Sequence, residues 1–196
     1  MEANIRLESF DEARDLPRLK EWLAKPHIAR WWPDIDLQVQ EARERPEGAG
    51  HVLIYLDDTP VGYMRWQHAD ASVLEEVGLC GIPDGSVDMD ILIGEPNLVG
   101  KRIGRRAIQM LRDRILNDST VPLVGMVTSV ANTNAIRAIE AAGFSPFQEY
   151  VDPRYGRCLV LTCGRPMADV DVNRAAGDAA QPGVEPDGPS ARGLMP

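Results

Sequence analysis

Long apolar runs are missing from this 196-residue sequence, which excludes a protein built from membrane-spanning helices. A spanning helix needs roughly 20 consecutive apolar residues. The apolar stretch 52–56, for example, runs directly into Asp57 and Asp58. The first residues also lack a basic segment followed by an apolar one, so we expect no signal peptide, a cytoplasmic location and no membrane partner.

Cysteine and positive charge are also scarce. The cysteines are Cys80, Cys158 and Cys163, an odd number without the spacing of metal ligands, so we expect buried reduced thiols and no metal site. Lysine and arginine total 21 against 30 aspartate and glutamate residues, which leaves a net charge of −9. A protein this acidic is a poor partner for nucleic acid, and it attracts cations.

The hydrophobic content of 44% suffices for a sizeable core, and the pattern along the chain predicts the elements around it. The expected strands are 5–7, 51–56, 61–66, 86–93, 121–127, 144–151 and 157–162. The expected helices are a first one capped by Asp11 or Asp15, then 37–45, 101–116 and 132–142, with 69–86 irregular.

This order of elements predicts an α/β (α+β) domain over residues 1–164, with a central mixed sheet and helices on both faces. Residues 165–196 differ in composition, because they are rich in Ala, Gly, Pro and Asp and contain no aromatic residue. Such a segment buries too little apolar surface to offset the entropy of ordering, so we expect a disordered tail.

A strand, a loop and the start of a helix follow one another between Asp90 and residue 106. The first amides of a helix have no partners inside it, and together with the helix dipole they form an anion site. Four cations stand in the first expected turns: Lys101, Arg102, Arg105 and Arg106. Cations there oppose the dipole, which favours a bound polyanion over the alternative of an exposed basic face. The GxxxxGK[ST] and GxGxxG patterns are absent, which excludes a Walker loop and a Rossmann fingerprint.

Residues 99–104, with the sequence VGKRIG, resemble the coenzyme A pyrophosphate loop of GNAT acetyltransferases, commonly [Q/R]xxGx[G/A]. Val99 replaces the usual Gln or Arg, and Arg102 replaces the first glycine. Because the loop binds through its amides, the site can survive this replacement if Arg102 keeps a helical conformation. The resemblance implies acetyl-CoA as acetyl donor and a sheet that is mostly antiparallel.

Residues 132–144, NTNAIRAIEAAGF, resemble the NxxAxxxYexxGF segment of the same family. Asn132 matches the asparagine that typically contacts the pantetheine arm. Ile139 stands where many relatives have the tyrosine that protonates the departing thiolate, so no tyrosine acid is assigned. A thiolate, with a pKa near 8.5, can leave with help from water.

The N-terminal half resembles one branch of this family, the aminoglycoside 6′-N-acetyltransferases. The shared series is RL, DL, EWL and HIxxWW, found here between Arg6 and Trp32, and Pro60 to Tyr63 matches a hairpin that reads PIGY. The resemblance covers roughly residues 5–163, and siderophore-lysine N-acyltransferases share some of it. It implies transfer of acetyl to the 6′-amino group of an aminoglycoside, and so antibiotic resistance.

The chemistry of this transfer needs a carboxylate, since an ammonium group must lose a proton before it can attack. Asp90, at the last polar position of its strand, is the candidate general base or amine-positioning anion. Asp88 lies on the same face, where it either binds a second ammonium or is merely solvated. Amides near residues 91–93 are candidates to polarise the thioester carbonyl.

The remaining candidates follow from these assignments. Those for the acetyl donor are Ile91, Leu92, Ile93, Val99, Gly100, Lys101, Arg102, Ile103, Gly104, Arg105 and Asn132. Those for a cationic acceptor are Trp32, Trp66, Asp88, Glu149 and Asp152. Trp31 is expected in the core, and His27 is expected to be structural.

Three functions remain open on the sequence. The first is acetylation of an aminoglycoside-like amine, and the second is acylation of another amine, such as a siderophore hydroxylysine or a protein N-terminus. The third is a binding module for a cationic ligand without turnover, which the replacements at Arg102 and Ile139 favour. We expect a monomer or a homodimer.

Overall fold

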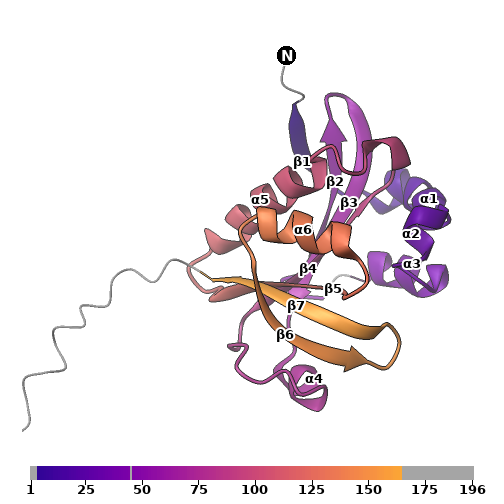
Figure 1. The fold of residues 1–196 in the computed structure, drawn as a ribbon. Coiled ribbons are helices and arrows are strands. Elements are labelled where there is room, and N and C mark those ends of the chain that lie inside the picture. Colours follow the sequence, from indigo (N-terminus) through magenta and orange to yellow (C-terminus); the bar gives the residue numbers. More distant parts are fainter. Residues whose placement is uncertain (1–3, 45, 165–196) are drawn as a thin grey trace, which may run out of the picture. The chain divides into compact units, whose positions relative to one another are not determined.

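The structure, a computed structural model, describes residues 4–44 and 46–164 (Figure 1). Its strands are β1 (Ile5–Ser9), β2 (Gly50–Leu56), β3 (Thr59–His68), β4 (Val87–Ile93), β5 (Leu123–Ser129), β6 (Ser145–Asp152) and β7 (Gly156–Gly164). Its helices are α1 (Glu12–Leu23), α2 (Pro26–Ala29), α3 (Ile35–Arg43), α4 (Ala71–Glu76), the 3₁₀ turn η1 (Pro96–Leu98), α5 (Ile103–Leu116) and α6 (Thr133–Ala141).

The strands form one sheet in the order β1-β2-β3-β4-β5-β7-β6. Neighbouring strands are antiparallel except β4 and β5, which are parallel. The sheet is therefore mixed and mostly antiparallel, with helices on both faces, and the predicted fold class is confirmed. Figure 1 shows α5 and α6 across one side, and α1, α2 and α3 gathered together.

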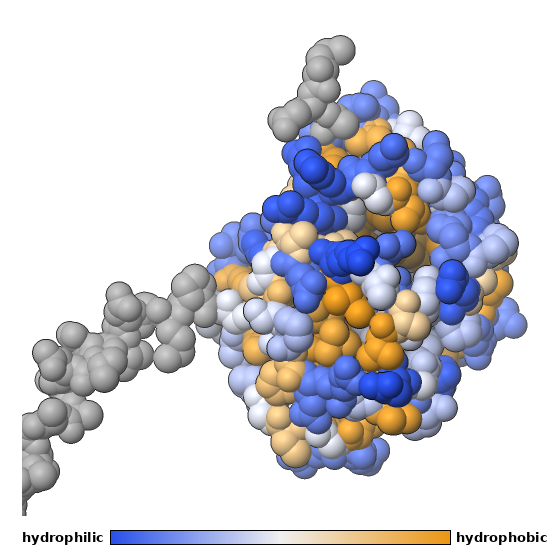
Figure 2. All heavy atoms as spheres, viewed as in Figure 1, coloured by the Kyte–Doolittle hydropathy of each residue, from blue (hydrophilic) through white to orange (hydrophobic). Residues whose placement is uncertain are grey.

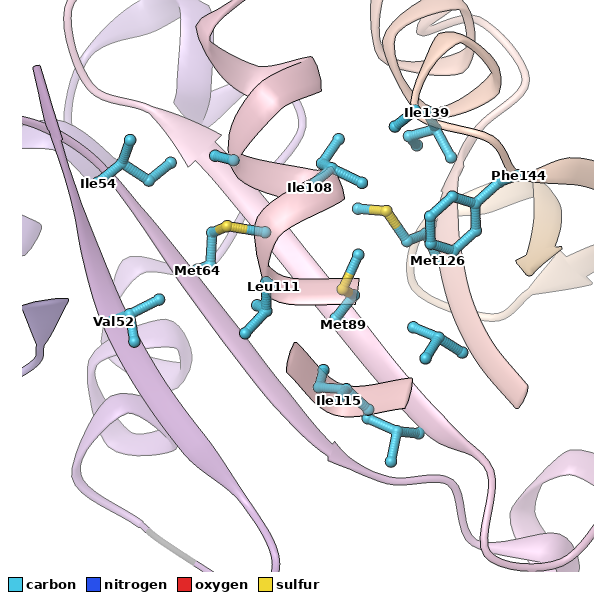
Figure 3. Packing of buried hydrophobic residues seen from close by; sticks show 14 of the residues in the cluster. Val52, Ile54, Met64, Met89, Ile108, Leu111, Ile115, Met126, Ile139 and Phe144 are labelled. Atoms are coloured by element: carbon cyan, nitrogen blue, oxygen red, sulfur yellow. The ribbon is translucent and has the colours of Figure 1, made fainter. Parts of the chain in front are cut away.

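One core lies between the sheet and α5 and α6. The helix α5 turns its apolar stripe, which includes Ile108 and Leu111, onto the sheet. Figure 3 shows Met64, Met89 and Met126 from three different strands meeting this stripe. Because these methionines alternate along their strands with residues of the opposite face, the polar residues between them point away from α5.

A second core lies on the opposite face. Leu19, Trp22 and Leu23 of α1 pack with Leu53 and Tyr63 of the sheet. Asp11 caps α1 by accepting a hydrogen bond from a backbone amide of the first turn, which decides between the two expected caps. Tyr63, like Asp88 and Asp90, belongs to this face, so the acidic residues of β4 point toward the side that α1–α3 cover.

Several expectations need correction. The segment 69–86, expected to be irregular, contains the short helix α4, and the helix expected from Lys101 begins at Ile103. Trp32, not Trp31, packs on the second core. Cys80 is exposed, although Cys158 is buried and all three cysteines are free.

The parallel pair β4–β5 is the feature that positions the site. Only Val87–Val124 and Asp88–Gly125 are in register, so the two strands diverge beyond Asp88. Between diverging strands the backbone groups of each strand lack a sheet partner. Figure 2 shows apolar residues gathered in the middle of this side of the molecule, bordered by hydrophilic ones.

In the described ranges, no helix is long and apolar enough to cross a membrane. The last strand ends at Gly164, where the predicted domain ends. The predicted tail, residues 165–196, lies outside the described residues, so the domain division stays a prediction.

Candidate active site

The first site element is the start of α5. Its first turn carries no side-chain cap from any residue that the structure describes. The Arg106 amide donates to the Arg102 carbonyl at 3.2 Å, as the fifth donor of a helix does. The earlier amides, of Arg102, Ile103, Gly104 and Arg105, are the ones that a helix leaves without intrahelical partners. They form the part of the predicted anion site that can donate to a phosphate.

The backbone at Arg102 does not have the right-handed helical conformation. Its φ and ψ are 66° and 4°, in the left-handed region, and Gly100 two residues earlier is left-handed too, with φ 77°. Arg102 therefore keeps the conformation that glycine adopts most easily, although it is an arginine. A left-handed backbone at a residue other than glycine costs about 1–2 kcal/mol of local strain.

Two other residues of the expected loop use their amides internally. The Val99 amide donates to Pro96 O at 3.3 Å, and the Lys101 amide donates to Leu98 O at 3.2 Å. These bonds close η1 and the turn after it, so Val99 and Lys101 hold the shape of the loop. A hollow of about 500 Å³ beside them is lined by the cationic side chains of Lys101, Arg102, Arg105 and Arg106 and by apolar residues of β1 and β2.

The second element is the edge of β4 that faces the gap. In an antiparallel pair, residues alternate in the side to which they direct N–H and C=O. The Gly94 amide donates to Val61 O at 2.8 Å, on the β3 side, whereas Ile93 O lies 3.1 Å from His27 Nε2. The same alternation directs the Ile91 and Ile93 amides toward the gap and the Leu92 amide toward β3. The Leu92 amide therefore does not face the gap with the other two, and the structural role of His27 stays a prediction.

Gly104 connects the helix start to this edge. A Cβ at Gly104 would lie 3.8 Å from both Ile91 Cδ1 and Ile93 Cγ1. The free amides of α5 and the free amides of β4 therefore lie around one space. An anion at the helix and a carbonyl at the strand can be held by the same elongated ligand.

The third element is an acidic hollow on the other side of β4. Its volume is about 60 Å³. Its charged lining is Glu41, Glu44, Arg65, Asp88 and Asp90, with His51 beside them. Four carboxylates surround one guanidinium, so the hollow favours cations.

Arg65 organises this hollow. Its Nε donates to Asp90 Oδ2 at 2.8 Å, and its Nη1 donates to Glu41. The Trp32 ring lies under the guanidinium, with 5.1 Å between the Arg65 Cζ and the ring centroid. Burial opposes the charge of Arg65, but the two carboxylates outweigh this effect and raise its pKa above the ordinary value. The guanidinium is thus fixed as a cation in contact with Asp90.

Asp88 has a different environment. Burial, and after it the Asp90 carboxylate, raise the pKa of Asp88 to about 7, although Arg65 and the Met89 amide act in the opposite direction. Some surface of Asp88 remains accessible, but protein atoms surround its carboxylate on most sides. Asp88 therefore has a pKa well above that of an ordinary aspartate.

Of the other residues predicted to bind the acceptor, some lie at the acidic hollow and some do not. Trp32 lies at the hollow through Arg65, and Trp66 lines it, although the Trp66 ring also lies near Arg114 of α5, 5.9 Å from its Cζ. Asp152 caps the turn after β6, where it accepts from two backbone amides, and it lies near the Tyr150 hydroxyl. Glu149 is exposed and pairs with Arg157 at 2.7 Å, so it is not brought to the hollow.

Asn132 and Ile139 lie at α6. The Asn132 side-chain oxygen caps this helix by accepting from the Ala135 amide at 3.3 Å, which leaves its NH₂ group to donate. Ile139 is buried in the first core, so it supplies no acid. Among the described residues there is no cluster of three or more metal-ligating side chains.

Glu41, Glu44 and Arg65 line the site but were not predicted from the sequence. The pairing of Arg65 with Asp90 depends on the register of β3 and β4, which the connection 69–86 hides. Glu41 reaches the site because α3 packs over the same face of the sheet. The one available signal was the position of Arg65 two residues after the Pro60–Tyr63 motif, which places it on the same strand face as Tyr63.

Comparison with known proteins settles the family. A family model described as "Acetyltransferase (GNAT) domain" matches residues 11–152. The chain belongs to this GNAT family. It is 29% identical over 145 residues to the aminoglycoside N(6′)-acetyltransferases type 1 of Klebsiella pneumoniae and of Serratia marcescens, covering 66% of this chain and 69% of each relative. The predicted resemblance to GNAT acetyltransferases, and among them to aminoglycoside 6′-N-acetyltransferases, is confirmed.

A solved GNAT structure has the same fold. The aminoglycoside acetyltransferase AAC(6′)-Ib in complex with coenzyme A and kanamycin is 27% identical, with a TM-score of 0.70 over 83% of this chain and 95% of that one. The GNAT family uses acetyl-CoA as donor. The uncapped start of α5 and the free edge of β4 fit this donor, since they offer amide donors for a pyrophosphate and for a thioester carbonyl.

Proposed function

We propose that this acetyltransferase transfers acetyl from acetyl-CoA to an amino group of a cationic, aminoglycoside-like acceptor, the 6′-amino group in an aminoglycoside. Such a reaction would confer resistance to the antibiotic. The proposal is supported by relatives that are aminoglycoside N(6′)-acetyltransferases and by the residues of the acidic hollow.

The observation that carries the proposal is the place of the four carboxylates. Glu41, Glu44, Asp88 and Asp90 line one hollow, and Asp88 is also the last β4 residue before the strands diverge. An ammonium group attracted by this hollow therefore arrives beside the gap in which the amides of Ile91 and Ile93 are free. An aminoglycoside carries several ammonium groups, so more than one carboxylate can bind it.

The residues have separate tasks in this proposal. The amides at the start of α5 hold the donor's pyrophosphate, and the Ile91 and Ile93 amides polarise its carbonyl. The donor supplies the acetyl group as a thioester. Asp90, fixed by Arg65, is the anion that positions the acceptor amine. The Asn132 NH₂ group is directed to the donor's pantetheine arm.

Arg65 favours one alternative acceptor. A guanidinium inside an otherwise acidic hollow can bind a carboxylate, so an amine that also carries a carboxylate, such as a siderophore hydroxylysine, is the second candidate. On that candidate Arg65 would exchange Glu41 or Asp90 for the acceptor's carboxylate. A preference for a longer acyl-CoA over acetyl-CoA would support it.

The test is a panel of amines with acetyl-CoA, in which released thiol is measured with a colorimetric reagent. We expect turnover of kanamycin by the parent protein. Glu44→Gln should raise the KM for kanamycin several-fold and leave the KM for acetyl-CoA unchanged. Glu149→Gln is the matched control, since Glu149 pairs with Arg157 away from the hollow.

No turnover of any aminoglycoside would refute the substrate. If turnover appeared only with amines that carry a carboxylate, the second candidate would replace the first. Binding of acetyl-CoA and of kanamycin without turnover of any amine would support a ligand-binding protein instead.

A further inference from the structure

The two carboxylates of β4 lie on one face of the strand but have different partners. Asp90 directs Oδ2 toward β3, where Arg65 Nε donates to it at 2.8 Å. Asp88 lies on the other side, toward β5, since its Oδ1 is 3.9 Å from the place that a Cβ at Gly125 would occupy. One carboxylate is thus turned toward β3 and the other toward β5.

The carboxylate of Asp90 is already engaged in an ion pair with Arg65. Protonation of Asp90 would weaken a charge-assisted hydrogen bond to a guanidinium that Glu41 and Trp32 hold in place. It would also leave the charge of Arg65 partly uncompensated in a half-buried position. Asp90 is therefore suited to hold a cationic amine as a fixed anion.

Asp88 has the opposite properties. It is in register with Gly125, the last pair before β4 and β5 diverge, and the absence of a side chain at Gly125 leaves space beside its carboxylate. In the described ranges, no lysine or arginine lies within ion-pair distance of Asp88. It lines the acidic hollow, as Asp90 does, and it is the last β4 residue that pairs with β5 before the gap.

We infer that Asp88, and not Asp90, is the catalytic residue that accepts the proton of the acceptor ammonium, while Arg65 keeps Asp90 as the positioning anion. This inference rests on the proposed function. The residue is new in this role, because the sequence pointed to Asp90 for proton transfer and to Asp88 only for binding.

The step is balanced as follows. An N–H bond of the ammonium breaks, and its proton moves to the Asp88 carboxylate. The nitrogen lone pair then forms the bond to the acetyl carbon while the carbon–sulfur bond breaks. The sulfur takes the second proton that the nitrogen loses, and Asp88 returns its own to water. An ammonium and a thioester thus become an amide, a thiol and one proton.

The raised pKa of Asp88 agrees with this assignment. A base works best when its pKa lies near the working pH, and the pKa of Asp88 is raised to about 7, first by burial and then by Asp90. The charged and titratable groups around Asp88 come from every neighbouring element: Asp90 and Arg65 in the sheet, His51 of β2, Glu41 of α3, Glu44 directly after α3, and Tyr150 of β6 with Asp152 beside it.

The test compares two matched amide variants, Asp88→Asn and Asp90→Asn, in the full chain with kanamycin and acetyl-CoA over pH 5–9. We expect Asp88→Asn to lower kcat by about 100-fold or more and to abolish the loss of activity below pH 7. Asp90→Asn should keep that loss of activity, raise the KM for kanamycin and lower kcat by no more than about tenfold. Asp88→Glu, which keeps a carboxylate, should recover a large part of the activity.

A measurement without substrate guards against misfolded variants. Carboxyl ¹³C NMR of the parent protein should show Asp88 titrating near neutral pH, and a titration below pH 5 would overturn the inference. Both asparagine variants should unfold cooperatively and should bind acetyl-CoA with nearly equal affinity. If Asp90→Asn lost the acidic limb and Asp88→Asn kept it, Asp90 would be the base and the inference would fall. Absence of turnover in the parent would instead refute the proposed function before any variant is made.

Discussion

Replacement of Arg102 by glycine is expected to stabilise the protein, because its backbone is left-handed. With φ 66° and ψ 4°, Arg102 is in a region that costs an L-residue about 1–2 kcal/mol and glycine almost nothing. Glycine gains more freedom in the unfolded chain, which offsets part of this. We therefore expect Arg102→Gly to raise the free energy of unfolding by about 1 kcal/mol.

The matched control is Arg102→Ala, which removes the same charge but keeps the unfavourable backbone. The difference in stability between the two variants isolates the conformational effect. Urea unfolding measures it directly, and the melting temperature of Arg102→Gly should exceed that of Arg102→Ala by about 2–4 °C for a domain of this size. Both variants should bind acetyl-CoA more weakly than the parent, to a similar degree, since both lack one cation at the start of α5.

Equal stability of the glycine and alanine variants would refute the left-handed conformation at Arg102. It would favour the helix start at Lys101 that the sequence alone predicts. An alanine variant more stable than the glycine variant would do so more strongly, because alanine is favoured over glycine inside a helix.

Two further predictions concern stability. The folded protein binds a proton at Asp88 up to about pH 7, whereas the unfolded carboxyl loses it near 3.8, so stability should fall as the pH rises between these values. The raised pKa corresponds to at most about 4 kcal/mol of destabilisation, and the partial exposure of Asp88 reduces this value. In urea unfolding, Asp88→Asn should therefore be about 1–2 kcal/mol more stable than the parent at pH 8 and equally stable at pH 4. No gain in stability at pH 8 would contradict the raised pKa. Gly94→Ala places a Cβ 2.3 Å from the buried Trp22 ring and should lower the free energy of unfolding by about 1–3 kcal/mol in the same assay. Gly164→Ala is the control and should be nearly neutral, because its Cβ would make only ordinary contacts. Equal effects of the two substitutions would contradict the packing at Trp22.

The sequence was sufficient for the fold because local patterns determine its parts. The helical spacing that includes Ile108 and Leu111 predicts the face that α5 buries, and the segment 132–144 predicts α6 and the strand after it. The alternation along β4 predicts that Asp88 and Asp90 share a face. These are properties of neighbouring residues, which a period in the sequence records.

The acceptor side was less predictable because it depends on tertiary packing. Arg65 and Asp90 meet only through the register of β3 and β4, and Glu41 joins them from α3. No local pattern records either contact. The conformation of Arg102 was missed for another reason, since a non-glycine residue is rarely left-handed and the rest of the loop overrides that preference.

Amide NMR of the start of α5 tests the central claim most directly. The ¹H–¹⁵N signals of Ile103, Gly104 and Arg105 should shift when acetyl-CoA is added, and acetyl-pantetheine, which lacks the pyrophosphate, should leave them in place while it shifts the signals of Ile91 and Ile93. Acetyl-CoA that bound without moving these three amides, or that moved signals on another part of the protein, would contradict the account.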